Sequence, residues 1–185
     1  MSKKILFNDK FGLTQAVLEG RKTMTRRLIP KKLLDSIELY AHGNEEELRY
    51  RLLANSSYHV GEVVAIAQAY KDICNDAYHI GLYGRTVGWE NKMFVKSDLM
   101  PHHIKITNIR VERLQDISYQ DCLKEGIERY FCTFGIKNCT GGAPLLGTYY
   151  ILPREAFAAL IDKVSGKGTW ESNPMVWVYE FKLVD

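Results

Sequence analysis

The segment His103–Leu114 constrains the fold more than any other part of the chain, because apolar and polar residues alternate along it. Ile104 and Ile106 fall on one face of the predicted strand, whereas Ile109 and Val111 continue the alternation one residue out of phase. A slip of one residue is what a β-bulge produces, and barrels use bulges to bend their strands. The sequence therefore predicts a long strand with a bulge near its middle.

The remaining periodic segments complete a mixed set of elements. Further strands are expected over residues 4–7, 61–70, 92–95 and 175–184. Helices are expected over residues 9–19, 118–126 and 153–166, with two less regular ones between residues 30 and 53. Because strands and helices do not follow a βαβ order, the predicted class is α+β, with a small, mostly antiparallel β-barrel flanked by helices.

Length and composition predict one domain spanning residues 1–185. A hydrophobic fraction of 46% and a charged fraction of 25% are ordinary for a globular protein that needs no disulfide or metal to hold its core. Less periodic segments at about 30–57, 71–92 and 128–150 are interpreted as insertions and loops. No apolar run approaches the roughly 20 residues of a membrane span, and the first residues lack signal-peptide features. We therefore expect a cytoplasmic protein that does not bind membranes; the sequence leaves its oligomeric state undetermined.

The cysteines do not form a recognisable metal motif. No Cys-x-x-Cys pair occurs among the four cysteines, which are Cys74, Cys122, Cys132 and Cys139. A zinc site that combines Cys132 and Cys139 with His102 or His103 would lack the usual close ligand spacing. The favoured interpretation is scattered reduced thiols, with no metal and no cofactor.

A basic loop follows the first predicted helix. Gly20 stands where a helix end favours a residue that tolerates positive φ. The stretch from Arg21 to Lys32 holds six basic residues and no acidic one, on a chain whose formal net charge is only +3. A local cluster on a nearly neutral protein indicates an anion site rather than a broad surface for long duplexes, although a solvated run of charges is the simpler alternative.

Three segments resemble one known family. Leu18–Arg27 contains the pattern G-R-K-T-x-T-x-R, Val111–Ser118 is followed by Lys124–Ile127, and Trp170–Phe181 closes the series in the same order. Together they resemble the ASCH family, a branch of the PUA-like superfamily, and most of all the ASCH proteins encoded by phages and prophages of bacteria. The resemblance covers about half of the chain and leaves the three predicted insertions outside.

The resemblance implies a PUA-like β-barrel with the basic loop at the mouth of a cleft. Proteins of this superfamily typically bind RNA or modified nucleotides. One small ASCH branch is an amidohydrolase that removes the acetyl group from N4-acetylcytidine, and its catalytic Lys, Thr and Glu match Lys22, Thr25 and Glu125. Candidate ligand-binding residues lie around them or, for one tryptophan, in the third segment: Arg21, Thr23, Arg26, Arg27 and Trp170.

The three matched residues suit amide hydrolysis. A threonine hydroxyl becomes a nucleophile when a base takes its proton, and a lysine can be that base when burial or nearby positive charge lowers its pKa. Glu125 could then donate a proton to the leaving amine. The alternatives are that Thr23 and Thr25 cap backbone groups, that Lys22 only contacts phosphate, and that Glu125 is a surface residue or holds a loop arginine in an ion pair.

Three functions follow from this sequence. The first is a module that binds RNA or a modified nucleotide beside the loop Gly20–Arg27. The alternative is an amidohydrolase of N4-acetylcytidine or related acylated nucleosides, and a further alternative is an interaction adaptor of a phage or mobile element. Trp170 could stack on a base or pack in the core. The insertions can reshape the cleft, so the substrate does not follow from the fold.

Overall fold

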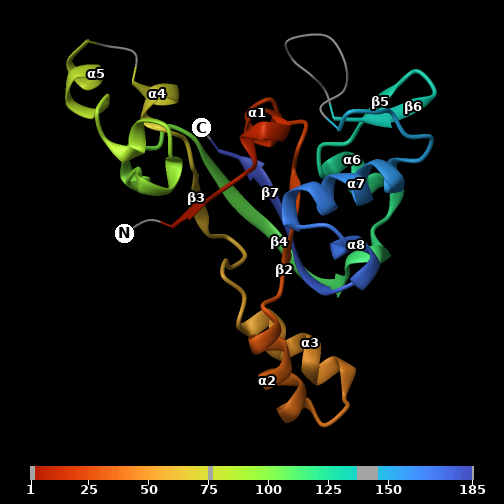
Figure 1. Cartoon of the computed structure of the whole chain (residues 1–185). Coiled ribbons are helices and arrows are strands. Elements are labelled where there is room, and N and C mark those ends of the chain that lie inside the picture. The colour runs from red at the N-terminus through yellow and green to blue at the C-terminus, as the bar shows by residue number, and fades with distance from the viewer. Residues whose placement is uncertain (1–2, 75–76, 137–145, 185) are drawn as a thin grey trace.

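The computed structural model describes residues 3–74, 77–136 and 146–184. Its centre is a five-stranded sheet in the order β1-β3-β4-β7-β2, and β1 and β3 are its one parallel pair (Figure 1). The strands are β1 (Lys4–Ile5), β2 (Met24–Leu28), β3 (Val63–Ile66), β4 (His103–Arg113) and β7 (Met175–Leu183). The predicted α+β class with a mostly antiparallel sheet is therefore confirmed.

The two longest strands, β4 and β7, pair at the middle of the sheet. Their register shifts between Ile106 and Asn108, so the predicted bulge is present. β7 is buried from Met175 to Tyr179 because it has a partner on both sides and helices over its face. Trp177 of β7 belongs to the core and is 5% exposed. Its indole N–H donates to the backbone oxygen of Leu52 at 2.8 Å.

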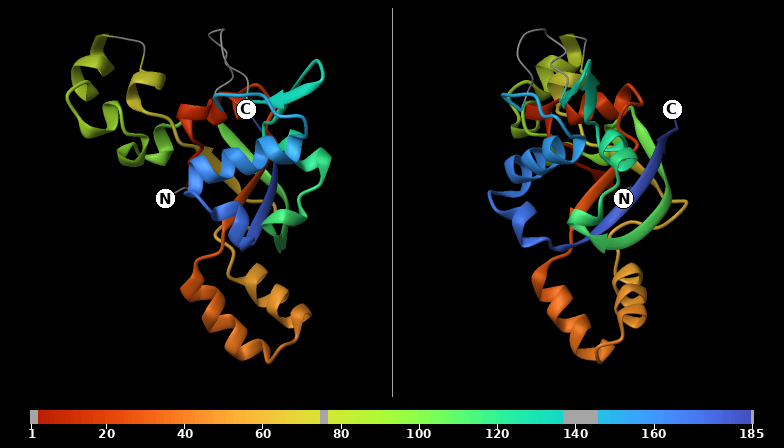
Figure 2. Two further views of the ribbon diagram at one scale, coloured as in Figure 1. Left: turned by 45° about the vertical axis from the view of Figure 1, so that its right-hand side comes forward. Right: turned by 90° about the vertical axis from the view of Figure 1, so that its right-hand side faces the viewer.

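The sheet is bent but open, with β1 at one edge and β2 at the other. Figure 2 shows the bend of β4 in its right-hand view. No ladder joins β1 to β2 in the described part of the chain. Instead, the Arg27 side chain from β2 donates a hydrogen bond to the backbone oxygen of Leu6, directly after β1. We call the gap between β2 and residues 6–8 the seam. The closed barrel stays a prediction.

The helix expected over residues 9–19 is interrupted at Gly12, whose φ of 62° ends the 3₁₀ helix η1 (Asp9–Phe11) before α1 (Leu13–Leu18) begins. Gly20 has the predicted positive φ. The Ser118 hydroxyl caps α6 (Tyr119–Lys124) by accepting from the backbone N–H of Asp121. The last helices are α7 (Pro153–Ser165) and α8 (Thr169–Ser172).

The segment 30–57 forms a helical hairpin that projects from one end of the sheet (Figure 1). It contains the two helices expected there, α2 (Lys31–Ala41) and α3 (Glu45–Ala54), and the Asn44 side chain caps α3. The hairpin is fixed to the sheet through the Ser56 hydroxyl, which lies 2.9 Å from the hydroxyl of Tyr179.

Two predictions for the other expected insertions and loops are wrong. The strand expected over 92–95 is a 3₁₀ turn, because the Asn91 side chain accepts from the backbone N–H of Met93 and starts a helical turn. Residues 128–135 form a hairpin instead of an irregular loop. The elements in these segments are α4 (Tyr70–Ile73), α5 (Ala77–Tyr83), η2 (Val87–Trp89), η3 (Lys92–Phe94), η4 (Ser97–Leu99), η5 (Leu114–Asp116), β5 (Glu128–Tyr130) and β6 (Thr133–Gly135).

Residues 137–145 of the loop expected over 128–150 lie outside the described residues. None of the helices within the described ranges has the length and apolar character needed to span a bilayer. The strand expected over 61–70 is shorter than predicted, because Tyr70 begins α4.

Candidate active site

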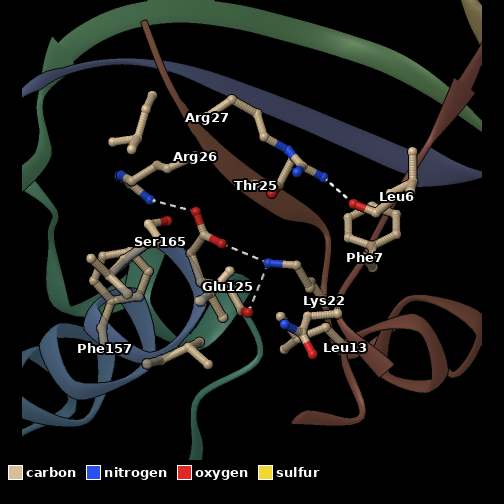
Figure 3. Close-up of a pocket in the computed structure, with 15 residues that line it drawn as sticks. Leu6, Phe7, Leu13, Lys22, Thr25, Arg26, Arg27, Glu125, Phe157 and Ser165 are labelled. Atoms are coloured by element: carbon tan, nitrogen blue, oxygen red, sulfur yellow. Dashed lines mark hydrogen bonds and ion pairs between the residues drawn. The ribbon is translucent and has the colours of Figure 1, made fainter. Parts of the chain in front are cut away.

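A cavity of about 250 Å³ lies along the seam (Figure 3). Three cations, Lys22, Arg26 and Arg27, and one carboxylate, Glu125, are the charged groups among its lining residues. Drug-sized ligands occupy cavities of about 300–1,000 Å³, so this cavity suits a smaller ligand or part of a larger one. The uncharged lining residues are Leu6, Phe7, Asn8, Leu13, Thr25, Leu28, Phe157, Leu160, Ile161, Val164 and Ser165.

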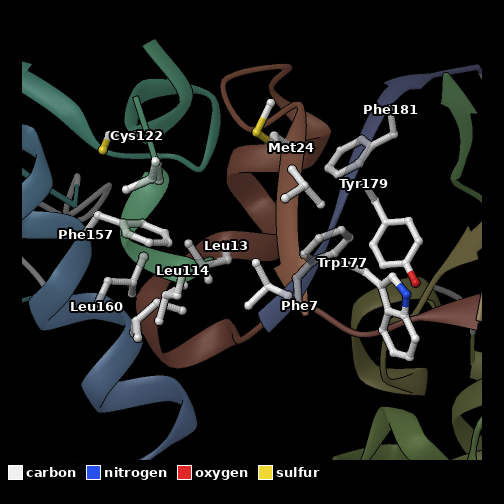
Figure 4. Close-up of a cluster of buried hydrophobic side chains, with 14 of the residues drawn as sticks. Phe7, Leu13, Met24, Leu114, Cys122, Phe157, Leu160, Trp177, Tyr179 and Phe181 are labelled. Atoms are coloured by element: carbon white, nitrogen blue, oxygen red, sulfur yellow. The ribbon is translucent and has the colours of Figure 1, made fainter. Parts of the chain in front are cut away.

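The apolar side of the cavity comes from α7 and from the segment after β1. Phe157 and Leu160 of α7 are buried and belong to the same core cluster as Phe7 and Leu13 (Figure 4). The cavity is therefore continuous with the core of the protein rather than a hollow between mobile loops. Apolar walls around a few charged groups lower the local dielectric and strengthen their electrostatic interactions.

The basic loop is held between α1 and α6 by backbone bonds. The N–H of Lys22 donates to the oxygen of Ala16 at 2.9 Å, and the N–H of Thr23 donates to the oxygen of Lys124 at 2.9 Å. These bonds place the Lys22 side chain beside Glu125, the residue that ends α6. Gly126 then turns the chain with a φ of 99°, and a Cβ at this position would lie 3.7 Å from the Cβ of Lys22.

Lys22 and Glu125 form a buried ion pair. The Lys22 Nζ lies 2.6 Å from Oε2 of Glu125 and donates to its backbone oxygen at 2.8 Å. The two residues are only 2% and 4% exposed. Burial lowers the pKa of Lys22, and the charges of Arg27 and Arg26 lower it further against the opposing effect of Glu125. Lys22 is therefore poised to give up its proton more readily than a lysine in water.

Arg26 connects Glu125 to two further carboxylates. Its Nη1 lies 3.1 Å from Oε1 of Glu125, and its Nη2 lies 2.6 Å from Oε1 of Glu112 and 3.1 Å from Oδ2 of Asp121. Arg110 pairs with the same two carboxylates from the opposite side. Because the guanidinium of Arg26 is fully engaged, its main role is to orient Glu125.

Thr25 and Arg27 project from the other face of β2, since successive residues of a strand alternate. Thr25 is buried, and its hydroxyl makes no hydrogen bond to any residue that the structure describes. Arg27 donates to Leu6 and lies 5.7 Å from the centre of the Phe7 ring. Thr25 thus offers an unengaged hydroxyl among the charged residues that line the cavity.

The backbone of β2 also faces the seam. The N–H of Phe181 donates to the oxygen of Thr23, and the N–H of Ile29 donates to the oxygen of Met175. In an antiparallel ladder such hydrogen-bonded positions recur at every second residue. The N–H and C=O groups of Arg26 and Leu28 therefore point away from β7, toward the open edge of the sheet.

Three of the predicted ligand-binding residues do not line the cavity. Arg21 pairs with Glu19 at 2.6 Å and with Glu128. Thr23 contributes its backbone to the loop. Trp170 is partly buried, with its ring 6.2 Å from that of Phe157 and 5.3 Å from the guanidinium of Arg154. The cavity is lined by the other candidates, Lys22, Thr25, Arg26, Arg27 and Glu125. The ligand-binding roles of Arg21, Thr23 and Trp170 stay predictions.

The carboxylates Glu112 and Asp121 were missed by the sequence analysis, as was Arg110. One signal in the sequence could have identified two of them. Arg110 and Glu112 are two residues apart on a predicted strand, so their side chains lie on the same face and can form an ion pair. Among the described residues, no group of three or more His, Cys, Asp or Glu side chains is arranged to hold a metal ion. Cys139, part of the zinc alternative, lies outside the described residues.

No family model, curated protein or solved structure matches the chain. The ASCH resemblance therefore stays an expectation based on the three sequence segments.

Proposed function

We propose that this protein is an amidohydrolase that removes the acyl group from N4-acetylcytidine or a related acylated cytidine. The observation that carries the proposal is the buried Lys22–Glu125 pair, which lines one cavity together with the unengaged hydroxyl of Thr25. The ASCH resemblance supplies the substrate class. It also implies a PUA-like barrel, in which a ligand would occupy the seam.

The Lys22–Glu125 pair can act as base and acid with a single proton. When the proton is on Lys22, the two residues form the ion pair seen in the structure. When the proton moves to Oε2 of Glu125, Lys22 becomes a neutral amine that can accept a proton, and Glu125 becomes an acid. Burial favours this transfer because it penalises the two charged forms together.

Acyl transfer then follows in balanced steps. Lys22 takes the proton of the Thr25 hydroxyl while Oγ1 forms a bond to the acyl carbon of the substrate. The bond from that carbon to the cytosine N4 breaks, and the nitrogen takes the proton of Glu125. A water molecule hydrolyses the acyl-threonine ester, which returns the starting protonation states. The open-edge N–H groups of β2 are the donors available to an oxyanion.

Binding of RNA or a modified nucleotide without hydrolysis is the second candidate. It is favoured by the excess of positive charge in the cavity, where three cations face one carboxylate. Under this alternative, Lys22 and Arg27 contact phosphate as fixed charges, and the protein releases no product from acylated substrates.

A hydrolysis assay separates the two candidates. Purified protein is incubated with N4-acetylcytidine and other acylated cytidines, and release of cytidine is followed by chromatography. We expect the wild type and Thr25→Ser to release product, and Thr25→Val to be slower by about 10³-fold or more, because it lacks the nucleophile. Full activity of Thr25→Val would remove Thr25 from the mechanism. No product with any substrate would favour binding alone.

The pH profile tests the shared proton. The reactive pair holds one proton, and at alkaline pH that proton is lost from Lys22. Because the pKa of Lys22 is lowered from 10.5, activity should fall at alkaline pH with a midpoint below 10.5. The rate of product release is measured against pH, with an enzyme-free blank to subtract base hydrolysis. Activity that rises steadily through this range would contradict the shared-proton mechanism.

A further inference from the structure

Arg27 differs from the other two cations that line the seam cavity. Lys22 pairs with Glu125, and Arg26 pairs with Glu112, Asp121 and Glu125. Arg27 makes no ion pair with any residue that the structure describes, and its Nε is buried without a hydrogen-bond partner. Among the described residues, its hydrogen-bond partner is the neutral carbonyl of Leu6.

An arginine in this position cannot avoid its charge by releasing a proton, because its pKa remains far above neutral pH. Burial disfavours the charged form and lowers the pKa of Arg27 without neutralising the side chain. The Phe7 ring and the Leu6 carbonyl offset part of the free-energy cost of burying this charge. A hydrogen bond to a carbonyl does not require a charged donor, so this bond does not explain why an arginine stands here. An anion supplied from outside the protein would complete the site.

A second cavity of about 250 Å³ lies on the other side of Arg27. Leu6, Arg27 and Leu28 line both cavities, so these residues form the wall between them. No acidic residue lines the second cavity; its remaining lining residues are Pro30, Ser57, Tyr58, Trp177 and Tyr179. A ligand that extends from the catalytic cavity toward this space passes the guanidinium of Arg27.

We propose that Arg27 binds a phosphate group of the substrate, so that the protein acts on a phosphorylated acylcytidine rather than on the free nucleoside. The acylated base lies beside Lys22, Thr25 and Glu125, and the phosphate meets the guanidinium donors that Leu6 does not use. A guanidinium matches phosphate well because its planar donors can form two parallel hydrogen bonds. This proposal rests on the proposed amidohydrolase function for its base subsite.

The first test compares ligands on the wild-type protein. Binding of cytidine, cytidine 5′-monophosphate, cytidine 3′-monophosphate and inorganic phosphate is measured by titration calorimetry. Hydrolysis of N4-acetylcytidine is measured beside that of its two monophosphates. We expect one monophosphate to bind about 10- to 100-fold more tightly than cytidine, as a charge-assisted contact provides, and its acetylated form to have the higher kcat/KM.

The second test uses variants of Arg27. Arg27→Gln should remove the preference for the monophosphate, and Arg27→Lys should keep part of it, because it retains the charge but not the paired donors. Arg49→Gln on α3, which removes a half-exposed arginine elsewhere, is the matched control and should keep the preference. Circular dichroism and thermal melting establish that each variant is folded.

The outcomes separate this inference from the proposed function. Equal binding of cytidine and both monophosphates by the wild type would overturn the role of Arg27, even if N4-acetylcytidine is hydrolysed. A phosphate preference that depends on Arg27, without hydrolysis, would support the phosphate site and count against the amidohydrolase. Tighter binding of a short RNA than of either monophosphate would overturn the mononucleotide substrate in favour of a polymer.

Discussion

Glu125→Gln is expected to slow hydrolysis of the substrate by about 10²- to 10⁴-fold. The glutamine side chain, unlike a carboxylate, cannot accept the shared proton and pass it to the leaving nitrogen. The same change leaves Lys22 buried at 2% exposure without its counter-charge. Removing one partner of a buried pair costs about 3–5 kcal/mol, so the free energy of unfolding should fall by a similar amount. Chemical denaturation and kcat/KM on N4-acetylcytidine measure the two effects.

A double variant distinguishes the chemical role of the pair from its structural role. Glu125→Gln combined with Lys22→Met removes the uncompensated charge, and an apolar replacement of a buried ion pair is often neutral for stability. We expect the double variant to regain most of the lost stability and none of the activity. Measurable recovery of hydrolysis in the double variant would show that the pair is structural only.

Arg26→Met is expected to destabilise the protein as strongly as Glu125→Gln does. It leaves the carboxylates of Glu112, Asp121 and Glu125 without their common partner. A loss of about 3–5 kcal/mol is expected, which for a chain of this length lowers the midpoint of thermal unfolding by roughly 6–20 °C. Differential scanning calorimetry of the purified variant gives the value.

The control for Arg26 is Arg110→Met in the same network. The Arg110 side chain is 31% exposed, so solvent screens its ion pairs with Glu112, Asp121 and Glu180. We expect Arg110→Met to lower the free energy of unfolding by only about 1 kcal/mol. If the two variants melt at the same temperature, burial does not set the strength of this network, and the assignment of Arg26 as the principal link is wrong.

The sequence predicted elements whose signals are local. The bulge near Asn108, the helix that follows Ser118 and the helix that begins at Pro153 are confirmed, because each is determined by side chains close together in the chain. The hairpin at 128–135 was missed, since its pairing is short and depends on contacts such as the bridge between Phe134 and Tyr150. The 3₁₀ turn at 92–94 was mistaken for a strand because an apolar run that short fits both structures.

At the site, the resemblance selected Lys22, Thr25 and Glu125, and all three line one cavity. Their catalytic roles stay predictions. The sequence could not predict how the basic residues divide their tasks: Arg26 meets carboxylates about a hundred residues away in the chain, and adjacent Arg27 meets none among the described residues. That difference depends on which face of β2 each side chain occupies and on what packs there.

The seam has a consequence for how such a protein can diversify. Backbone ladders form with nearly any side chain, so the four ladders that join the five strands tolerate substitution. The contact between the sheet edges depends instead on the identity of a single residue, Arg27, whose side chain donates to the backbone oxygen of Leu6. One replacement at Arg27 can change the width of the seam cavity while the ladders stay intact. The shape of this cavity can thus diverge between related proteins by point mutation, without any change in the sheet that supports it.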